Sequence, residues 1–151
     1  MTRPSPNRKR QQRGAALVEF AVSWALLWAM FAGLFQFGYS FMVYNRLKTT
    51  VANAAAFAAR MEYDTSNTSA FTTSLKNLVV YGDLTASGVA VVPGLTTGAV
   101  SVQITSSSGT PQYVTISVTG FSVNAVFGNF SFAGKPRATT AYYGNLICSG
   151  C

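Results

Sequence analysis

The sequence predicts an α+β protein, in which one long N-terminal helix is followed by a short helix and a small antiparallel β-sheet domain. Three observations predict it: residues 20–45 carry no charged side chain, residues 15–61 contain no proline, and apolar residues alternate with polar ones after residue 98. A long proline-free apolar run is typical of a helix, and a period of two is typical of a strand. The 151 residues therefore divide into a leader (1–14), a long helix (15–61) and a β-rich domain (62–151).

The leader is short and basic. Five of the 11 Lys and Arg residues precede Gly14, whereas the chain from Ala15 onward has six cations and four acids, so the remainder is nearly neutral. Two prolines among charged side chains predict an extended, solvated segment. A nucleic-acid-binding arm would also be basic, but the apolar run that follows favours the flank of a membrane anchor. We therefore expect no nucleic-acid partner.

The apolar run predicts a single membrane-spanning helix over about residues 20–45. About 20 apolar residues suffice to cross a bilayer as a helix, and this run has no charge over its whole length. Its basic N-terminal flank predicts a cytoplasmic N-terminus, with the C-terminal domain on the periplasmic or extracellular side of the inner membrane. A cleavable secretory signal would have an apolar core of only about 7–15 residues, so the run is better explained as an anchor.

Glu19 lies at the edge of this run, with apolar residues on both sides. A carboxylate in hydrocarbon costs on the order of 2–3 kcal/mol or more unless it has a partner, and no cation occurs between Arg13 and Arg46. Cleavage after Gly14 would give Ala15 a free amine one helical turn before Glu19, where it would pair with the carboxylate of the same chain or of a parallel neighbour. The alternative is that Glu19 extends to the lipid headgroups.

Together these features resemble the type IV prepilin-like (class III) signal: a basic leader, Gly14, a Glu at the fifth position after the cut, the aromatic Phe20 and a long apolar helix. Residues 10–61 resemble the TadE-like family of minor pseudopilins in tight-adherence (Flp, type IVc) pilus systems. The resemblance implies that a prepilin peptidase cuts between Gly14 and Ala15. It also implies that the product assembles a pilus for cell adhesion, with other pilins or pseudopilins and the inner-membrane pilus platform as partners.

Small residues recur along the long helix at a spacing of four. The first set predicts close packing of helices in lipid and consists of Ala21, Ala25, Ala29 and Gly33. A second set, in the half predicted to protrude from the membrane, consists of Ala52 and Ala56, with Ala55 and Ala59 nearby. The alternative is that Ala occurs there because it is a good helix former.

The domain that follows begins with a short helix, which Thr68 or Ser69 caps and Gly82 ends after Tyr81. Alternation then predicts two strands joined by a turn at Ser106–Pro111. We expect the short helix and the end of the long helix to cover one face of the sheet. The two alternating strands are predicted at 100–105 and 114–119. A further strand is predicted at Val89–Val92, and the last strand at Ala138–Tyr143.

Two C-terminal segments allow more than one interpretation. Phe121–Phe132 carries four phenylalanines, and it is either a loop folded over the core or an exposed patch that docks on a partner pilin. Cys148 and Cys151 are too few to bind zinc in a chain without His. Outside the cytoplasm an oxidised pair is expected, either as an intramolecular disulfide or as a bond to a partner.

The composition argues against an enzyme. There is no His, and the acids beyond the apolar run are only Glu62, Asp64 and Asp83, with no nucleophile–base pattern. We therefore expect no catalytic residues, no metal site and no cofactor. The favoured function is a structural subunit for pilus assembly. The alternative is an unprocessed membrane-anchored adhesin or receptor that presents a Ser/Thr-rich β domain.

Overall fold

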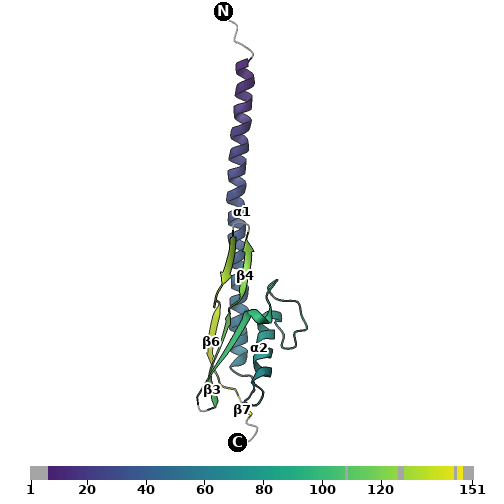
Figure 1. The fold of residues 1–151 in the computed structure, drawn as a ribbon, viewed down its shortest axis with the longest axis vertical. Coiled ribbons are helices and arrows are strands. Elements are labelled where there is room, and N and C mark those ends of the chain that lie inside the picture. The colour runs from purple at the N-terminus through teal and green to yellow at the C-terminus, as the bar shows by residue number, and fades with distance from the viewer. Residues whose placement is uncertain (1–6, 108, 126–127, 145, 148–151) are drawn as a thin grey trace, which may run out of the picture. The chain divides into compact units, whose positions relative to one another are not determined.

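The structure is a computed structural model that describes residues 7–107, 109–125, 128–144 and 146–147. It consists of two compact units, Met1–Tyr39 and Ser40–Cys151, and the long helix α1 (Asn7–Ala58) contributes to both. The second unit adds a second helix and small β-sheets (Figure 1). The predicted α+β class is therefore confirmed.

Helix α1 begins within the segment that the sequence predicts to be extended. It starts at Asn7, so the prediction of an extended leader is wrong for residues 7–14. The physical reason is that both leader prolines precede Asn7, while residues 8–13 consist entirely of Arg, Lys and Gln, which are good helix formers. At its other end the helix stops at Ala58, where the N–H of Met61 donates to the carbonyl of Phe57 at 3.1 Å.

In the second unit, one face of α1 belongs to the core of the domain. Its buried residues recur at intervals of three and four, which places them on one side of a helix. The residues between them are exposed or half-buried. The buried set is Val43, Leu47, Val51, Ala54, Ala55 and Ala58.

Helix α2 (Thr68–Tyr81) has a defined cap at each end. The side-chain oxygen of Asn67 accepts from the N–H of Ala70 at 3.3 Å, so the cap lies one residue before the predicted Thr68. Gly82 ends the helix as predicted, in the left-handed conformation (φ 73°) that glycine adopts without steric cost. The side of α2 that joins the core consists of Phe71, Leu75, Val79 and Val80.

A three-stranded antiparallel sheet provides the other wall of the core. Its order is β2 (Val100–Ser107), β3 (Thr110–Val118) and β6 (Arg137–Ala141), and a short 3-10 helix η1 (Thr97–Ala99) precedes it. The register pairs Val102 with Ile116, and Ile116 with Ala138. The predicted alternation is confirmed, and β2 and β3 extend further into the turn than expected.

The central strand β3 gives the sheet two different faces. Val114, Ile116 and Val118 are fully buried against the helices. On the other face, the hydroxyls of Thr115 and Thr139 are 3.0 Å apart and share a hydrogen bond across β3 and β6. The outward face is therefore polar but carries little charge, as the sequence indicates.

Residues 121–125 and 128–132 form a second sheet that the sequence did not predict. Strands β4 (Phe121–Ala125) and β5 (Gly128–Phe132) pair as an antiparallel hairpin. Phe121 is buried, Phe132 is half-buried, and both belong to or pack against the core. Neither interpretation of this segment is complete, because it is a regular hairpin rather than a loop and only some of its phenylalanines join the core.

The predicted strand at Val89–Val92 is wrong. In the structure this segment lies in an irregular connection between α2 and η1. Its Val91 N–H donates to the carbonyl of Val80 at 2.8 Å, and Pro93 with Gly94 (φ +82°) then turns the chain. A proline and a positive-φ glycine directly after a short apolar run interrupt a ladder, which explains the difference.

The C-terminal part of the domain returns to the end of α1. After β6, the N–H of Tyr143 donates to the carbonyl of Ala59 at 2.8 Å, and the Tyr142 hydroxyl donates to the carbonyl of Met61 at 2.9 Å. Two further short strands, β1 (Tyr63–Asp64) and β7 (Leu146–Ile147), then pair in parallel. These contacts fasten the last described residues to the point where the long helix ends.

Candidate functional site

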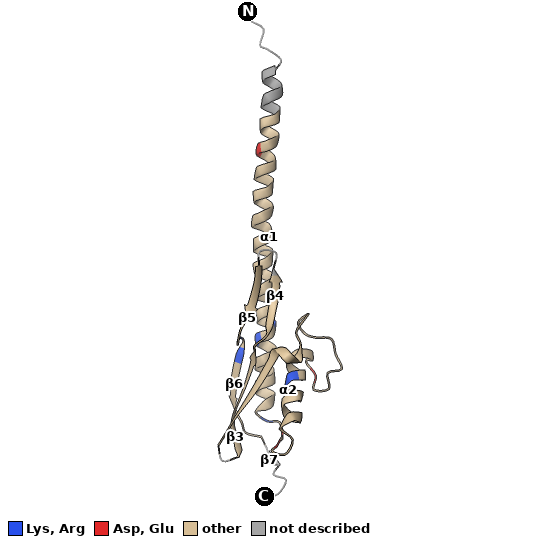
Figure 2. Ribbon diagram, viewed as in Figure 1, with Lys and Arg blue, Asp and Glu red and all other residues tan. Residues whose placement is uncertain are grey.

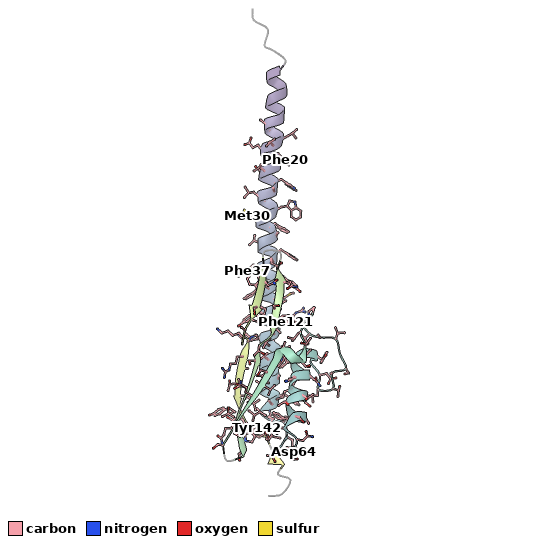
Figure 3. The ribbon with its side chains drawn as sticks, in the orientation of Figure 1. Phe20, Met30, Phe37, Asp64, Phe121 and Tyr142 are labelled. Atoms are coloured by element: carbon pink, nitrogen blue, oxygen red, sulfur yellow. The ribbon has the colours of Figure 1, made fainter. Side chains whose placement is uncertain are left out.

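The first unit consists of an apolar helix whose large side chains are exposed. They project from α1 on all sides, as the side chains around Phe20, Met30 and Phe37 show (Figure 3). The residues that the structure describes contain one helix, Gly14–Ala58, that is long and apolar enough to cross a membrane. A helix that is apolar all round must be surrounded by lipid or by other helices.

Aromatic side chains of this segment contact one another along the helix surface. Phe20 stacks on Trp24, and Trp28 packs edge-to-face on Phe31, each with ring centroids 6.1 Å apart. These pairs are separated by four and three residues, the spacings at which helix side chains meet. The aromatic rings thus form ridges that a neighbouring helix or lipid chains would have to accommodate.

Within residues 14–45 the only charged residue in the sequence is Glu19. In Figure 2 the coloured part of α1 that precedes the β-sheets is tan apart from a single red position. Ala15 and Glu19 are four residues apart within the same helix, so they lie on one face. An amine formed at Ala15 would therefore be on the side of α1 that carries the carboxylate.

Gly14 lies inside α1 rather than in an extended segment. A Cβ atom there would meet nothing within 4 Å, so steric crowding within the chain does not explain the glycine. Gly destabilises a helix interior by about 1 kcal/mol relative to Ala. Gly14 therefore weakens the helix at the position where the sequence predicts cleavage.

The two sets of small residues have different surroundings. Ala21, Ala25 and Ala29 are exposed, Gly33 is half-buried, and a Cβ at Gly33 would meet nothing within 4 Å. The second set divides between two faces. Ala52 and Ala56 are exposed, whereas Ala55 and Ala59 are buried within the protein's own domain.

Ionisable groups with a displaced pKa lie in the second unit. The pKa of Asp64 is lowered because the Ser66 hydroxyl and backbone N–H donate to its carboxylate. The pKa of Asp83 is lowered by the hydroxyls of Ser87 and Thr85. Both carboxylates organise turns. Among the described residues, no group of three or more His, Cys, Asp or Glu is placed to hold a metal ion.

Sequence reasoning did not identify the contact between Tyr44 and Phe132. Their rings are stacked with centroids 5.7 Å apart, which joins α1 to β5. The available signal was that Tyr44 is an aromatic residue near the end of the uncharged run, where aromatic side chains often mark the membrane surface. The predicted disulfide residues, Cys148 and Cys151, lie outside the described residues.

Fold and site together define a class: proteins with one N-terminal apolar helix, able to anchor in a membrane, that continues into a small α+β domain. Comparison with known families is consistent with this class, because residues 14–60 match the family described as TadE-like protein. The predicted resemblance is thereby confirmed over the long helix. The match suggests a Tad pilus-associated, pilin-like protein. No curated protein and no solved structure matches the chain significantly.

Proposed function

We propose that this protein is a minor pilin or pseudopilin-like subunit that assembles a tight-adherence (type IVc, Flp) pilus. The observation that carries the proposal is the TadE-like match over residues 14–60, which covers the predicted processing junction and the apolar helix. The exposed large side chains of the first unit support it, because such a helix requires a membrane or neighbouring helices around it.

Processing would be the first step in its function. In the proposal, the basic leader stays in the cytoplasm, the apolar segment crosses the inner membrane, and the domain lies on the periplasmic side. A prepilin peptidase then cuts between Gly14 and Ala15. The new Ala15 amine neutralises Glu19 of the same or a neighbouring helix, which lowers the cost of transferring that carboxylate into an apolar environment.

The two faces of α1 in the second unit would serve two purposes. One face fastens the domain to the helix through residues such as Leu47 and Val51, both buried. The other face exposes Ala52, Ala56 and Phe57, a small-residue surface with one aromatic. In the proposal this surface and the stripe from Ala21 to Gly33 pack against other pilins or pseudopilins and the pilus platform.

Mass spectrometry of the full protein purified from membranes tests the processing step. We expect a mature N-terminus at Ala15, and a Gly14→Val chain that keeps its leader because a branched side chain hinders access to the cut. Gly38→Val is the matched control, since a Cβ at Gly38 also meets nothing within 4 Å and the residue lies far from the junction. An intact leader in protein that still supports piliation would contradict the processing step, whereas an intact leader together with no effect of the protein on piliation would favour the unprocessed adhesin or receptor.

A further inference from the structure

The β4–β5 hairpin has one apolar face and no charge. Residues 121–134 contain no Lys, Arg, Asp or Glu. The register pairs Phe121 with Phe132 and Val123 with Phe130, so all four lie on one face of the hairpin. The alternate pairs, which lie on the other face, are Ser122 with Ser131 and Asn124 with Asn129.

The apolar face is only partly used by the protein's own core. Phe121 and Val123 are buried, and Phe132 is half-buried. Phe130, on the same face, is 50% exposed. Half of the Phe130 ring surface is therefore available to a partner outside the chain.

The position of the hairpin beside α1 indicates what kind of partner Phe130 would contact. Phe132 stacks on both Phe121 and Tyr44, with centroids 6.1 and 5.7 Å apart. Tyr44 is the last residue but one of the uncharged run 20–45. That run is about 39 Å long at 1.5 Å per residue, and the hydrocarbon core is about 30 Å thick. The end of the run, with the ring of Phe132 beside it, therefore lies at the level of the headgroups.

The hairpin also points in the direction that such a contact needs. Beyond β6, Tyr142 bonds to Met61 just after the end of α1, which fixes that end of the domain as the one remote from the apolar run. Figure 1 shows the β4–β5 hairpin directed away from this end. Within the second unit, β4 and β5 thus lie on the side of the domain opposite Met61.

Exposed cations flank the hairpin and Tyr44 in the sequence. Lys135 and Arg137 follow β5, and Arg46 and Lys48 follow Tyr44 on α1; all four are exposed. Aromatic rings with nearby Lys and Arg are typical of the membrane–water interface, where the rings enter the headgroup layer and the cations bind anionic lipid. No acid lies among residues 121–147 to oppose this attraction.

We infer that the β4–β5 hairpin is a second membrane contact, in which Phe130 enters the interfacial layer of the bilayer that α1 spans and Lys135 and Arg137 bind anionic headgroups. The contact would hold the domain in one orientation on the membrane before assembly. This inference rests on the proposed membrane anchoring of α1. Its partner is the lipid surface rather than a second protein.

Quenching of tryptophan fluorescence by brominated lipid tests the inference in the full chain. The natural Trp24 and Trp28 are first changed to Phe, and one tryptophan is then introduced by F130W or Y113W. Tyr113 is the matched control because it is also 50% exposed but lies on the polar face of the sheet. Each chain is reconstituted in phosphatidylcholine vesicles with and without phosphatidylglycerol, with bromine on acyl carbons near the headgroup.

We expect the F130W chain to lose about half of its emission and the Y113W chain little, because only the first tryptophan would lie within the interfacial layer. Adding K135Q and R137Q should remove most of the extra quenching that phosphatidylglycerol produces. Equal quenching of the two chains would overturn the inference. So would a blue shift of F130W emission that depends on protein concentration in lipid-free detergent, which would identify a second copy as the partner.

The natural tryptophans separate this inference from the proposed anchoring. In the unchanged chain, Trp24 and Trp28 lie within the apolar run and should be quenched by bromine deep in the acyl chains. If they are quenched and the F130W chain is not, only the hairpin contact is wrong. If they are not quenched, the chain does not insert, and both the anchoring and the hairpin contact are wrong.

Discussion

At the scale of single residues, the most constrained position lies where the chain returns to the end of α1. A Cβ atom at Gly144 would lie 2.5 Å from the Met61 carbonyl oxygen and 2.6 Å from the Tyr142 hydroxyl oxygen. Those two oxygens are joined by the hydrogen bond that fastens the residues after β6 to α1. Glycine is therefore required here for space rather than for a special backbone conformation.

Gly144→Ala should destabilise the protein by about 1–3 kcal/mol, because the methyl group forces apart a packed hydrogen-bonded pair. Gly120→Ala is the matched control, since its Cβ would make an ordinary contact of 3.7 Å with the Cα of Ala99. Thermal unfolding of the full chain in detergent, followed by circular dichroism, measures both. Equal midpoints for the two variants would show that the return of the chain to Met61 is not tightly packed.

The pKa of the Tyr142 hydroxyl, in the same region, is shifted by burial. Desolvation is the main cause that raises the pKa of Tyr142 above its usual value of 10.0, and the charge of Glu62 adds to it. A phenol with a raised folded-state pKa stabilises the fold below pH 10, and this contribution decreases as the pH rises further. The hydrogen bond to Met61 is consistent with the neutral phenol, which keeps its proton to donate.

At the scale of elements, the sequence predicted the helices and strands whose ends are determined by their own residues. Helix α2 follows from its apolar spacing and from Gly82, and β2 and β3 follow from strict alternation on either side of a Gly-containing turn. The short parallel pair of β1 with β7 was not predictable in this way. It joins residues more than 80 positions apart, so its formation depends on tertiary contacts that no local pattern encodes.

Prediction from the sequence has a second limit, which concerns the β4–β5 hairpin and the buried and exposed faces of α1. Four phenylalanines in a short segment allowed either burial against the core or an exposed patch, and did not tell which rings take which environment. Likewise, an Ala-rich helix has a weak apolar stripe, so spacing alone did not tell which alanines face the domain. Ala55 and Ala56 are adjacent in sequence, yet one is buried and the other exposed.

Ala55→Leu should therefore destabilise the domain by about 1–3 kcal/mol through overpacking, and Ala56→Leu should change stability by no more than about 0.5 kcal/mol. Thermal unfolding of both full-length variants measures the difference. In cells, Ala56→Leu should nevertheless reduce piliation if the exposed face packs against other subunits. Similar destabilisation by both changes would contradict the assignment of the two faces.

At the scale of the whole molecule, one continuous helix has two environments. Its apolar segment exposes its large side chains, and its later residues contribute a single stripe to the core of the domain. The first requires an external apolar phase, whereas the second is satisfied within the chain. In the proposed assembly, neighbouring subunits would therefore pack mainly against the first segment. Glu19 is the residue there whose energy depends most strongly on its surroundings.

Glu19→Ala should leave cleavage and membrane insertion intact while most pili are lost, because the Ala15 amine would then be buried without its partner at a cost of about 3–5 kcal/mol. Glu62→Ala is the control, since this acid lies outside the apolar run. Mass spectrometry reports cleavage, carbonate extraction reports insertion, and electron microscopy reports the number of pili per cell. Normal piliation of the Glu19→Ala strain would show that the carboxylate does not pair with the new amine during assembly, and would instead support its extension to the headgroups.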